Sequence, residues 1–240
     1  MSSKEAESIL DWWEEAGVDT IVGETPRDWL AVKPRPTTAF VAAPAAPAMA
    51  EPAPAPILPD TIDSFQAWFV DGLGLPLGAP GAPRVGPSGD PASGLMILVD
   101  MPGPADFAAS TLLAGEVGTL FDKMMGAIGR GRETLYLASL SPLRTPTGTL
   151  DPATAANLAT IARHHIGLAA PRALLLFGDI ASKALTGGTV AGARQRWHEI
   201  DTPAGRIKTL VTMKPEKDMI QPLKKLVWED LQMLMEGLKP

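Results

Sequence analysis

The chain has 240 residues, of which 45 % are hydrophobic and 20 % charged, and its formal net charge is −6. A chain of this length and apolar content can bury one sizeable core. The absence of cysteine excludes disulfides, thiolate zinc sites, cysteine-ligated iron–sulfur clusters and cysteine nucleophiles. Since no apolar run approaches the roughly 20 residues of a membrane span and the start lacks a signal-peptide pattern, we expect a soluble cytoplasmic protein.

Charge is distributed unevenly along the chain. Residues 1–143 carry 8 Lys and Arg against 18 Asp and Glu, a net −10, whereas residues 144–240 carry 13 against 9, a net +4. A basic C-terminal half can face a polyanion such as nucleic acid, which an acidic N-terminal half cannot. An ordinary solvated surface explains the same counts equally well.

The first sixty residues predict a tethered helix. Ser3–Ala16 has an amphipathic pattern, with Trp12 and Trp13 on its apolar face. Lys33–Asp60 contains eight prolines among alanines, a composition that blocks both helix and sheet. We therefore predict a leader at 1–32, a Pro/Ala-rich linker at 33–60 and a compact domain at 61–240. The Trp12–Trp13 helix either docks on that domain or contacts a protein partner.

From residue 61 onward, helices alternate with short apolar strands. A helix over TIDSFQAWFVDGL, capped by Asp60 or Thr61, is followed by a Gly/Pro-rich stretch at 72–94. The predicted strands are Leu95–Val99, Leu135–Ser139, Ala173–Phe177 and Lys208–Thr212. The predicted helices are Glu116–Ile128, Pro152–Gly167, Asp179–Leu185 and Pro222–Gly237. This pattern predicts an α/β fold, a three-layer αβα domain with a central, mainly parallel four-stranded sheet.

The strand ends carry the candidate chemistry, because ligands of parallel sheets bind at the carboxyl ends of the strands. LVDMPG places Asp100 there, before a Pro-Gly turn whose amides can approach a phosphate or a base. A turn-capping role explains the same Asp100. The second strand ends at Ser139 and leads to Arg144, and VTMKPEKDMIQP after the fourth strand contains Lys214.

In order and spacing, these segments resemble the uracil-DNA glycosylase superfamily, specifically its bacterial iron–sulfur branch, over about Asp63–Lys239. LMILVDMPG stands in the place of an apolar strand plus G-E-A-P-G, and LYLASLSPLRTP in that of Y-I-T-N-x-V-K-C-R-P-P. VTMKPEKDMIQP stands in the place of T-x-H-P-A-Y-L-L-R-x-P. The helical segments LAGEVGTLFDKMMGAIG, TLDPATAANLATIARHHI and ALLLFGDIASKALTG also match in order. The resemblance implies the family's fold and a relation to DNA repair.

The resemblance also implies a role for each matching position in turning a uracil out of the DNA stack and cutting its glycosidic bond. Asp100 stands at the acid position and Lys214 at that of a catalytic His. Leu113 stands at the position of a base-stacking ring, and Ser139 at that of an Asn that reads the base edge. The remaining base-pocket positions are Pro102 and Gly103, and the DNA-contacting positions are Arg144, Lys217 and Met219, the last near the family's apolar wedge.

The positions of the cluster ligands that can be placed, Leu75 and Leu143, are apolar. We therefore expect no iron–sulfur cluster, no other metal and no other cofactor, and we expect both leucines to pack inward. The three aromatic residues of the C-terminal half, Phe177, Trp197 and Trp228, are few for stacking single strands on aromatic rings.

Three functions remain open. A serine lacks the paired donor and acceptor by which an amide reads uracil, so the preferred hypothesis is a degenerate member that has lost uracil excision. It would act as a DNA- or protein-binding module related to DNA repair, near the nucleoid if it binds DNA. A second hypothesis is an active glycosylase of altered base specificity that uses Asp100 and Lys214. A third is a protein-assembly module without nucleic acid.

Overall fold

The computed structural model describes residues 58–72, 75, 77–78 and 81–239. The predicted N-terminal helix and most of the Pro/Ala-rich linker lie outside these residues, so the division at 1–32 and 33–60 stays a prediction. Within the described part of the chain, no helix is long and apolar enough to cross a membrane.

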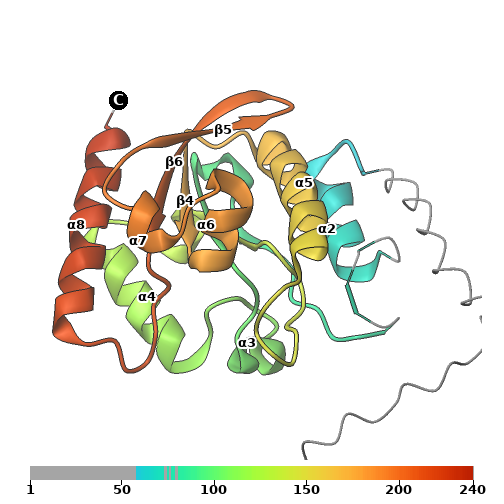
Figure 1. Ribbon diagram of the computed structural model, residues 1–240, viewed down its shortest axis with the longest axis horizontal. Coiled ribbons are helices and arrows are strands. Elements are labelled where there is room, and N and C mark those ends of the chain that lie inside the picture. The colour runs from blue at the N-terminus through green and yellow to red at the C-terminus, as the bar shows by residue number, and fades with distance from the viewer. Residues whose placement is uncertain (1–57, 73–74, 76, 79–80, 240) are drawn as a thin grey trace, which may run out of the picture. The chain divides into compact units, whose positions relative to one another are not determined.

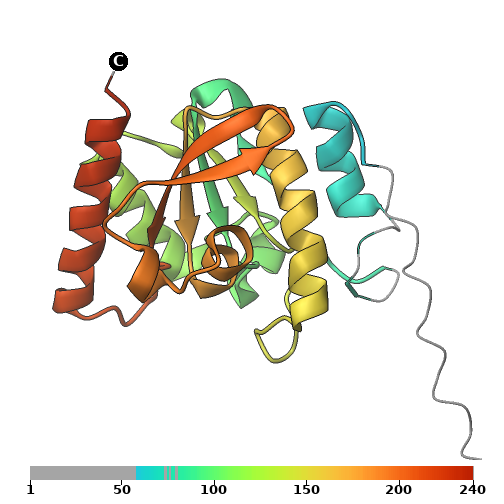
Figure 2. The same ribbon diagram turned by 45° about the horizontal axis from the view of Figure 1, so that its top comes forward.

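A six-stranded sheet in the order β1-β3-β2-β4-β6-β5 forms the centre of the domain (Figure 2). Its strands are β1 (Ser88–Gly89), β2 (Leu95–Val99), β3 (Tyr136–Ser139), β4 (Ala173–Phe177), β5 (His198–Thr202) and β6 (Gly205–Thr212). The four inner strands run parallel and confirm the predicted ones, while β1 and β5 add short antiparallel edges that were not predicted.

Helices cover both faces of the sheet and confirm the three-layer fold (Figure 1). The helices are α2 (Ile62–Asp71), α3 (Pro104–Ala109), α4 (Gly115–Ala127), α5 (Pro152–Ala169), α6 (Asp179–Thr186), α7 (Val190–Ala193) and α8 (Gln221–Gly237). One core lies between the sheet and α2, α5, α6 and α7, and the other between the sheet and α4 and α8. Along β2, Met96 and Leu98 belong to the first core and Leu95, Ile97 and Val99 to the second, as the alternation of a strand requires.

A buried polar network ties α2, β3 and α5 together in the first core. Gln66 Nε2 donates to the Tyr136 hydroxyl at 2.9 Å, and that hydroxyl lies 2.8 Å from His165 Nε2. Burial lowers the pKa of His165 to about 3 and raises the pKa of Tyr136 to about 12. His165 is therefore neutral at pH 7, and its Nε2 shares a hydrogen bond with the protonated tyrosine hydroxyl. This histidine serves packing, since it also stacks on Phe65 with the ring centroids 4.3 Å apart.

Candidate functional site

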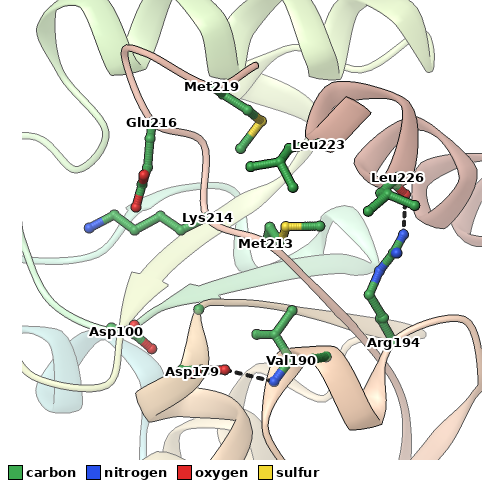
Figure 3. Close-up of a pocket in the computed structure, with 12 residues that line it drawn as sticks. Asp100, Asp179, Val190, Arg194, Met213, Lys214, Glu216, Met219, Leu223 and Leu226 are labelled. Atoms are coloured by element: carbon green, nitrogen blue, oxygen red, sulfur yellow. Dashed lines mark hydrogen bonds between the residues drawn. The ribbon is translucent and has the colours of Figure 1, made fainter. Parts of the chain in front are cut away.

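Two cavities open at the carboxyl ends of the inner strands, and they share Lys214 and Glu216. The larger has a volume of about 670 Å³ (Figure 3). Its apolar lining comes from Val190, Ala191, Met213, Met219, Leu223 and Leu226, and its charged lining from Asp100, Asp179, Arg194, Lys214 and Glu216. The smaller has a volume of about 240 Å³ and is lined by the loop after β2, the start of α4, Arg144 and the loop after β6.

Asp100 caps a helix at the bottom of the larger cavity. Its Oδ1 accepts from the backbone N–H of Ala181, at 2.6 Å, in the first turn of α6. A side chain at Gly178, where φ is 109°, would overlap this carboxylate, so glycine is required there. Burial raises the pKa of Asp100, although backbone hydrogen bonds from Ala181 and Ile180 and the charge of Lys214 oppose that shift. Asp100 thus has a structural role in addition to its place in the cavity.

Lys214 is half-buried and lies on the boundary between the two cavities. Figure 3 shows its side chain extending between the carboxylates of Glu216 and Asp100. Within the described ranges, however, no ion pair links it to either acid. Its ammonium group can therefore meet a ligand in either cavity.

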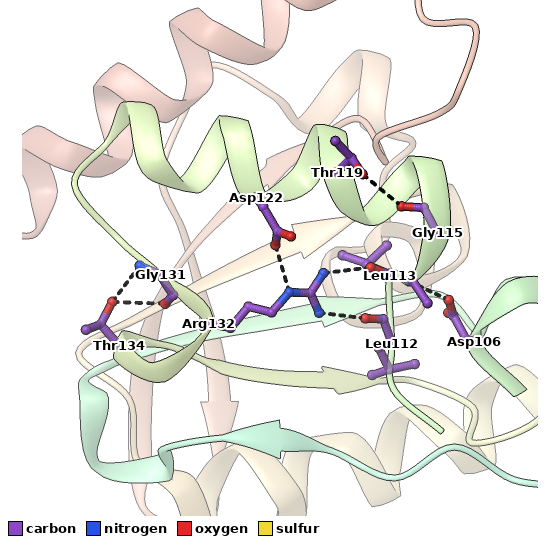
Figure 4. Close-up of polar contacts among 10 residues, drawn as sticks. Asp106, Leu112, Leu113, Gly115, Thr119, Asp122, Gly131, Arg132 and Thr134 are labelled. Carbon is purple, nitrogen blue, oxygen red and sulfur yellow. Dashed lines mark hydrogen bonds and ion pairs between the residues drawn. The ribbon is translucent and has the colours of Figure 1, made fainter. Parts of the chain in front are cut away.

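The wall of the smaller cavity is fixed by Asp106 and Arg132 (Figure 4). Asp106 is 3 % exposed, and its two oxygens accept from the N–H groups of Gly103 and Ala114, at 2.8 and 2.7 Å. The Arg132 guanidinium donates to the carbonyls of Leu112 and Leu113, at 3.0 and 2.7 Å. These bonds hold Leu113 in the left-handed region, with a φ of 51°, which a leucine rarely adopts.

Ser139, predicted at the base-reading position, is 2 % exposed and lines neither cavity. Its Oγ is the only buried side-chain oxygen or nitrogen without a hydrogen-bond partner in the described part of the chain. Pro102 is also buried, and its carbonyl accepts from Arg144 Nη1 at 3.4 Å. The structure therefore brings Gly103, Leu113, Arg144, Lys214 and Lys217 around the smaller cavity, but not Ser139.

The loop after β6 contains two of the three positions predicted to contact DNA, Lys217 and Met219. Met219 is buried and lines the larger cavity, whereas the next residue, Ile220, is 60 % exposed. Lys217 is exposed and forms an ion pair with Glu116 of α4 at 2.7 Å. The exposed apolar side chain of this loop is thus that of Ile220, next to Met219.

Comparison with known families agrees with this arrangement. The family model of the uracil DNA glycosylase superfamily matches residues 87–232, which include both cavities. The chain belongs to the uracil DNA glycosylase superfamily. No curated protein matches the sequence. The membership confirms the resemblance, and members of this superfamily bind DNA.

The residues at the expected cluster positions of this superfamily member do not fit an iron–sulfur cluster. Leu75 and Leu143 are both buried, as predicted, and apolar side chains cannot ligate iron. The two loops that contain them are joined directly, because Val85 N–H donates to the Pro142 carbonyl at 2.8 Å. Among the residues that the structure describes, no three His, Asp or Glu side chains gather as metal ligands.

Sequence reasoning missed the residues that support the site. Asp106 had a weak signal, an acid three positions after Gly103 at the start of a helix, where it can accept from orphan N–H groups. No sequence pattern pointed to Arg132, because it lies 19 residues from Leu113, whose carbonyl it contacts. Arg194 lines the larger cavity, but its guanidinium donates to the fully buried carboxylate of Asp230. Asp230 also accepts from Thr212 Oγ1 at 2.6 Å.

Proposed function

We propose that this superfamily member binds DNA at the carboxyl ends of its strands and does not excise uracil. The observation that supports this most is the position of Ser139, whose hydroxyl is buried, unpartnered and outside both cavities. A site that reads a base by hydrogen bonds discriminates by a factor on the order of 10⁴–10⁵. Ser139 offers no such contact to a uracil in either cavity.

The other chemical positions support the same conclusion. Leu113 gives the smaller cavity an aliphatic wall where a stacking ring would be needed. Asp100 already accepts the N–H of Ala181, and Lys214 stands at the position of the catalytic histidine. Because acid–base and electrostatic contributions are worth about 2–4 kcal/mol of barrier each, losing several leaves a rate too low for repair. Binding needs less, and Arg144, Lys214 and Lys217 supply charges for phosphate groups.

A second candidate is a glycosylase that acts on a different base. Two observations favour it: Asp100 and Lys214 line the same cavity, and burial raises the pKa of Asp100, as a general acid requires. The two candidates differ in whether a glycosidic bond is cut.

A glycosylase assay separates these candidates. The full chain, in excess over substrate, is incubated with single- and double-stranded oligonucleotides that carry uracil, hypoxanthine or xanthine, and strand breakage is measured after alkali. A known uracil-DNA glycosylase serves as the positive control. We expect no breakage. Breakage that disappears in Asp100→Asn would replace the proposal by the second candidate.

DNA binding is tested by fluorescence anisotropy with an undamaged oligonucleotide at several salt concentrations. We expect binding that weakens with salt, and a salt slope reduced by about 0.7–0.9 in Lys214→Ala and in Arg144→Ala. The matched control is Lys208→Ala, which removes an equal charge from an exposed position in β6, before the strand reaches its carboxyl end. Absence of binding, or equal losses in all three variants, would contradict the proposal.

A further inference from the structure

The sizes of the two cavities suggest which one holds a ligand. Sites for small ligands measure about 300–1,000 Å³. The smaller cavity, where the superfamily resemblance places the base pocket, has about 240 Å³ and falls below this range. The larger cavity, on the other side of Lys214, has about 670 Å³ and falls within it. None of the predicted base-pocket positions lines this larger cavity.

The lining of the larger cavity suits a flat, aromatic ligand. Two methionines from the loop after β6, Met213 and Met219, face it together with Leu223 of α8 (Figure 3). Thioethers make favourable contacts with aromatic rings and adapt to rings of different shape. A nucleobase is such a ring, so methionines here can take the part that aromatic side chains play in other single-strand binding proteins.

Polar groups of the same cavity suit the polar edge of a base and the phosphate next to it. Asp179 Oδ1 accepts from the N–H of Val190 at 2.7 Å, which fixes this carboxylate at the cavity edge. Carboxylate oxygens accept from the exocyclic amines of bases. Lys214 has no ion-pair partner among the described residues and lies at the boundary, where a phosphate next to the bound base would pass.

The loop after β6 disfavours a duplex. Taking a base out of paired DNA requires an apolar wedge to fill the gap. Met219 is turned into the cavity, and the exposed Ile220 follows the exposed acids Glu216 and Asp218, which disfavour insertion of this loop between the two phosphate backbones of a duplex. A base that is already unpaired needs no wedge.

We propose that the larger cavity receives an unpaired nucleobase of single-stranded DNA, with Lys214 beside the neighbouring phosphate. This inference rests on the proposed function, and names single-stranded DNA as its ligand. It differs from the superfamily resemblance in the place where the base binds, which is between α7 and α8 and not against Leu113.

The test compares three fluorescent probes of one sequence without uracil: a single strand, the same strand with abasic residues at its centre, and the duplex. Anisotropy with the full chain gives the affinities at one salt concentration. We expect the single strand to bind about tenfold more tightly than the duplex, and the abasic residues to lower the affinity about fivefold. Equal binding of the single strand and the duplex, or of the single strand and the abasic strand, would overturn the inference.

Ala191→Leu narrows the larger cavity from an exposed position in α7 without removing a core side chain. Ala127→Leu is the matched control, because Ala127 is an exposed alanine of α4 that lines a different cavity, which shares only Met219 with the larger one. We expect Ala191→Leu to weaken binding of the ordinary strand about fivefold and to leave binding of the abasic strand unchanged, and Ala127→Leu to change neither. Equal losses on both strands would overturn the inference, whereas no binding of any probe by the unmodified chain would overturn the proposed function itself.

Discussion

The two loops that border the smaller cavity differ in how firmly side-chain contacts hold them. The loop after β2, residues 100–114 with the short α3 within it, is held by side chains: the buried Asp106 accepts from two of its N–H groups, and the partly exposed Arg132 donates to two of its carbonyls. Among the described residues, the loop after β6, residues 213–220, has one side-chain hydrogen bond or ion pair, the exposed pair of Lys217 with Glu116. Side-chain contacts thus fix the first loop, while the second loop, which carries Lys214, has few of them among the described residues. The position of Leu113 therefore depends on side-chain hydrogen bonds, whereas that of Lys214 depends mainly on the backbone of its loop.

Among the substitutions that test this difference, removal of the Asp106 carboxylate should lower the free energy of unfolding most. In Asp106→Ala the N–H groups of Gly103 and Ala114 lose a buried acceptor, so we expect the free energy of unfolding to fall by about 3 kcal/mol, measured by urea denaturation. Asp90→Ala is the matched control, because Asp90 accepts one N–H at 2.8 Å at an exposed position, and it should cost about 1 kcal/mol or less. Equal effects would show that burial of Asp106 does not hold the first loop.

Arg132→Met keeps the aliphatic stem and removes the donors. Its side chain is 34 % exposed, so water can replace part of what is lost, and we expect a smaller destabilisation of about 1–2 kcal/mol. Leu113 should then leave the left-handed region, and limited proteolysis should cut the chain within residues 110–114 faster than in the unmodified protein. Lys123→Met, an exposed substitution on α4, should leave the cleavage rate unchanged.

Much of the fold could be predicted from the sequence, because the inner strands are apolar runs and Thr61 and Asp151 cap the helices that follow them, each accepting an N–H three residues on. The edge strand β5, HEIDT, was missed because Ile200 is its only apolar residue, and α7 was missed because four residues show no helical period. For the site, the carboxyl-end rule placed Asp100 and Lys214 correctly at one cavity. It could not place Ser139, because a residue that ends a strand faces either the core or the cavity, and only packing decides between them.

Asp100 is the charged residue of the first loop that lines the larger cavity. Asp100→Asn tests whether its charge lowers the stability of the folded protein. Since burial raises the pKa of Asp100, the folded state binds this proton more tightly than the unfolded state does. The contribution of Asp100 to stability is therefore present below its unfolded value of about 3.9 and is lost as the pH rises through the folded pKa. We expect Asp100→Asn, whose amide oxygen still accepts from Ala181, to stabilise the protein by up to about 1 kcal/mol at pH 7 and to change little at pH 3. Lower stability at pH 7 would mean that the charge itself is needed to cap α6.

Separating Lys217 from Glu116 should have the smallest effect of all. Both side chains are more than half exposed, and such pairs are screened by water and salt, so we expect Lys217→Ala and Glu116→Ala to leave the melting temperature unchanged. The comparison with Asp106→Ala is informative because Asp106 and Lys217 both line the smaller cavity. If the melting temperature fell as far in Lys217→Ala as in Asp106→Ala, the loop after β6 would be as firmly held as the loop after β2.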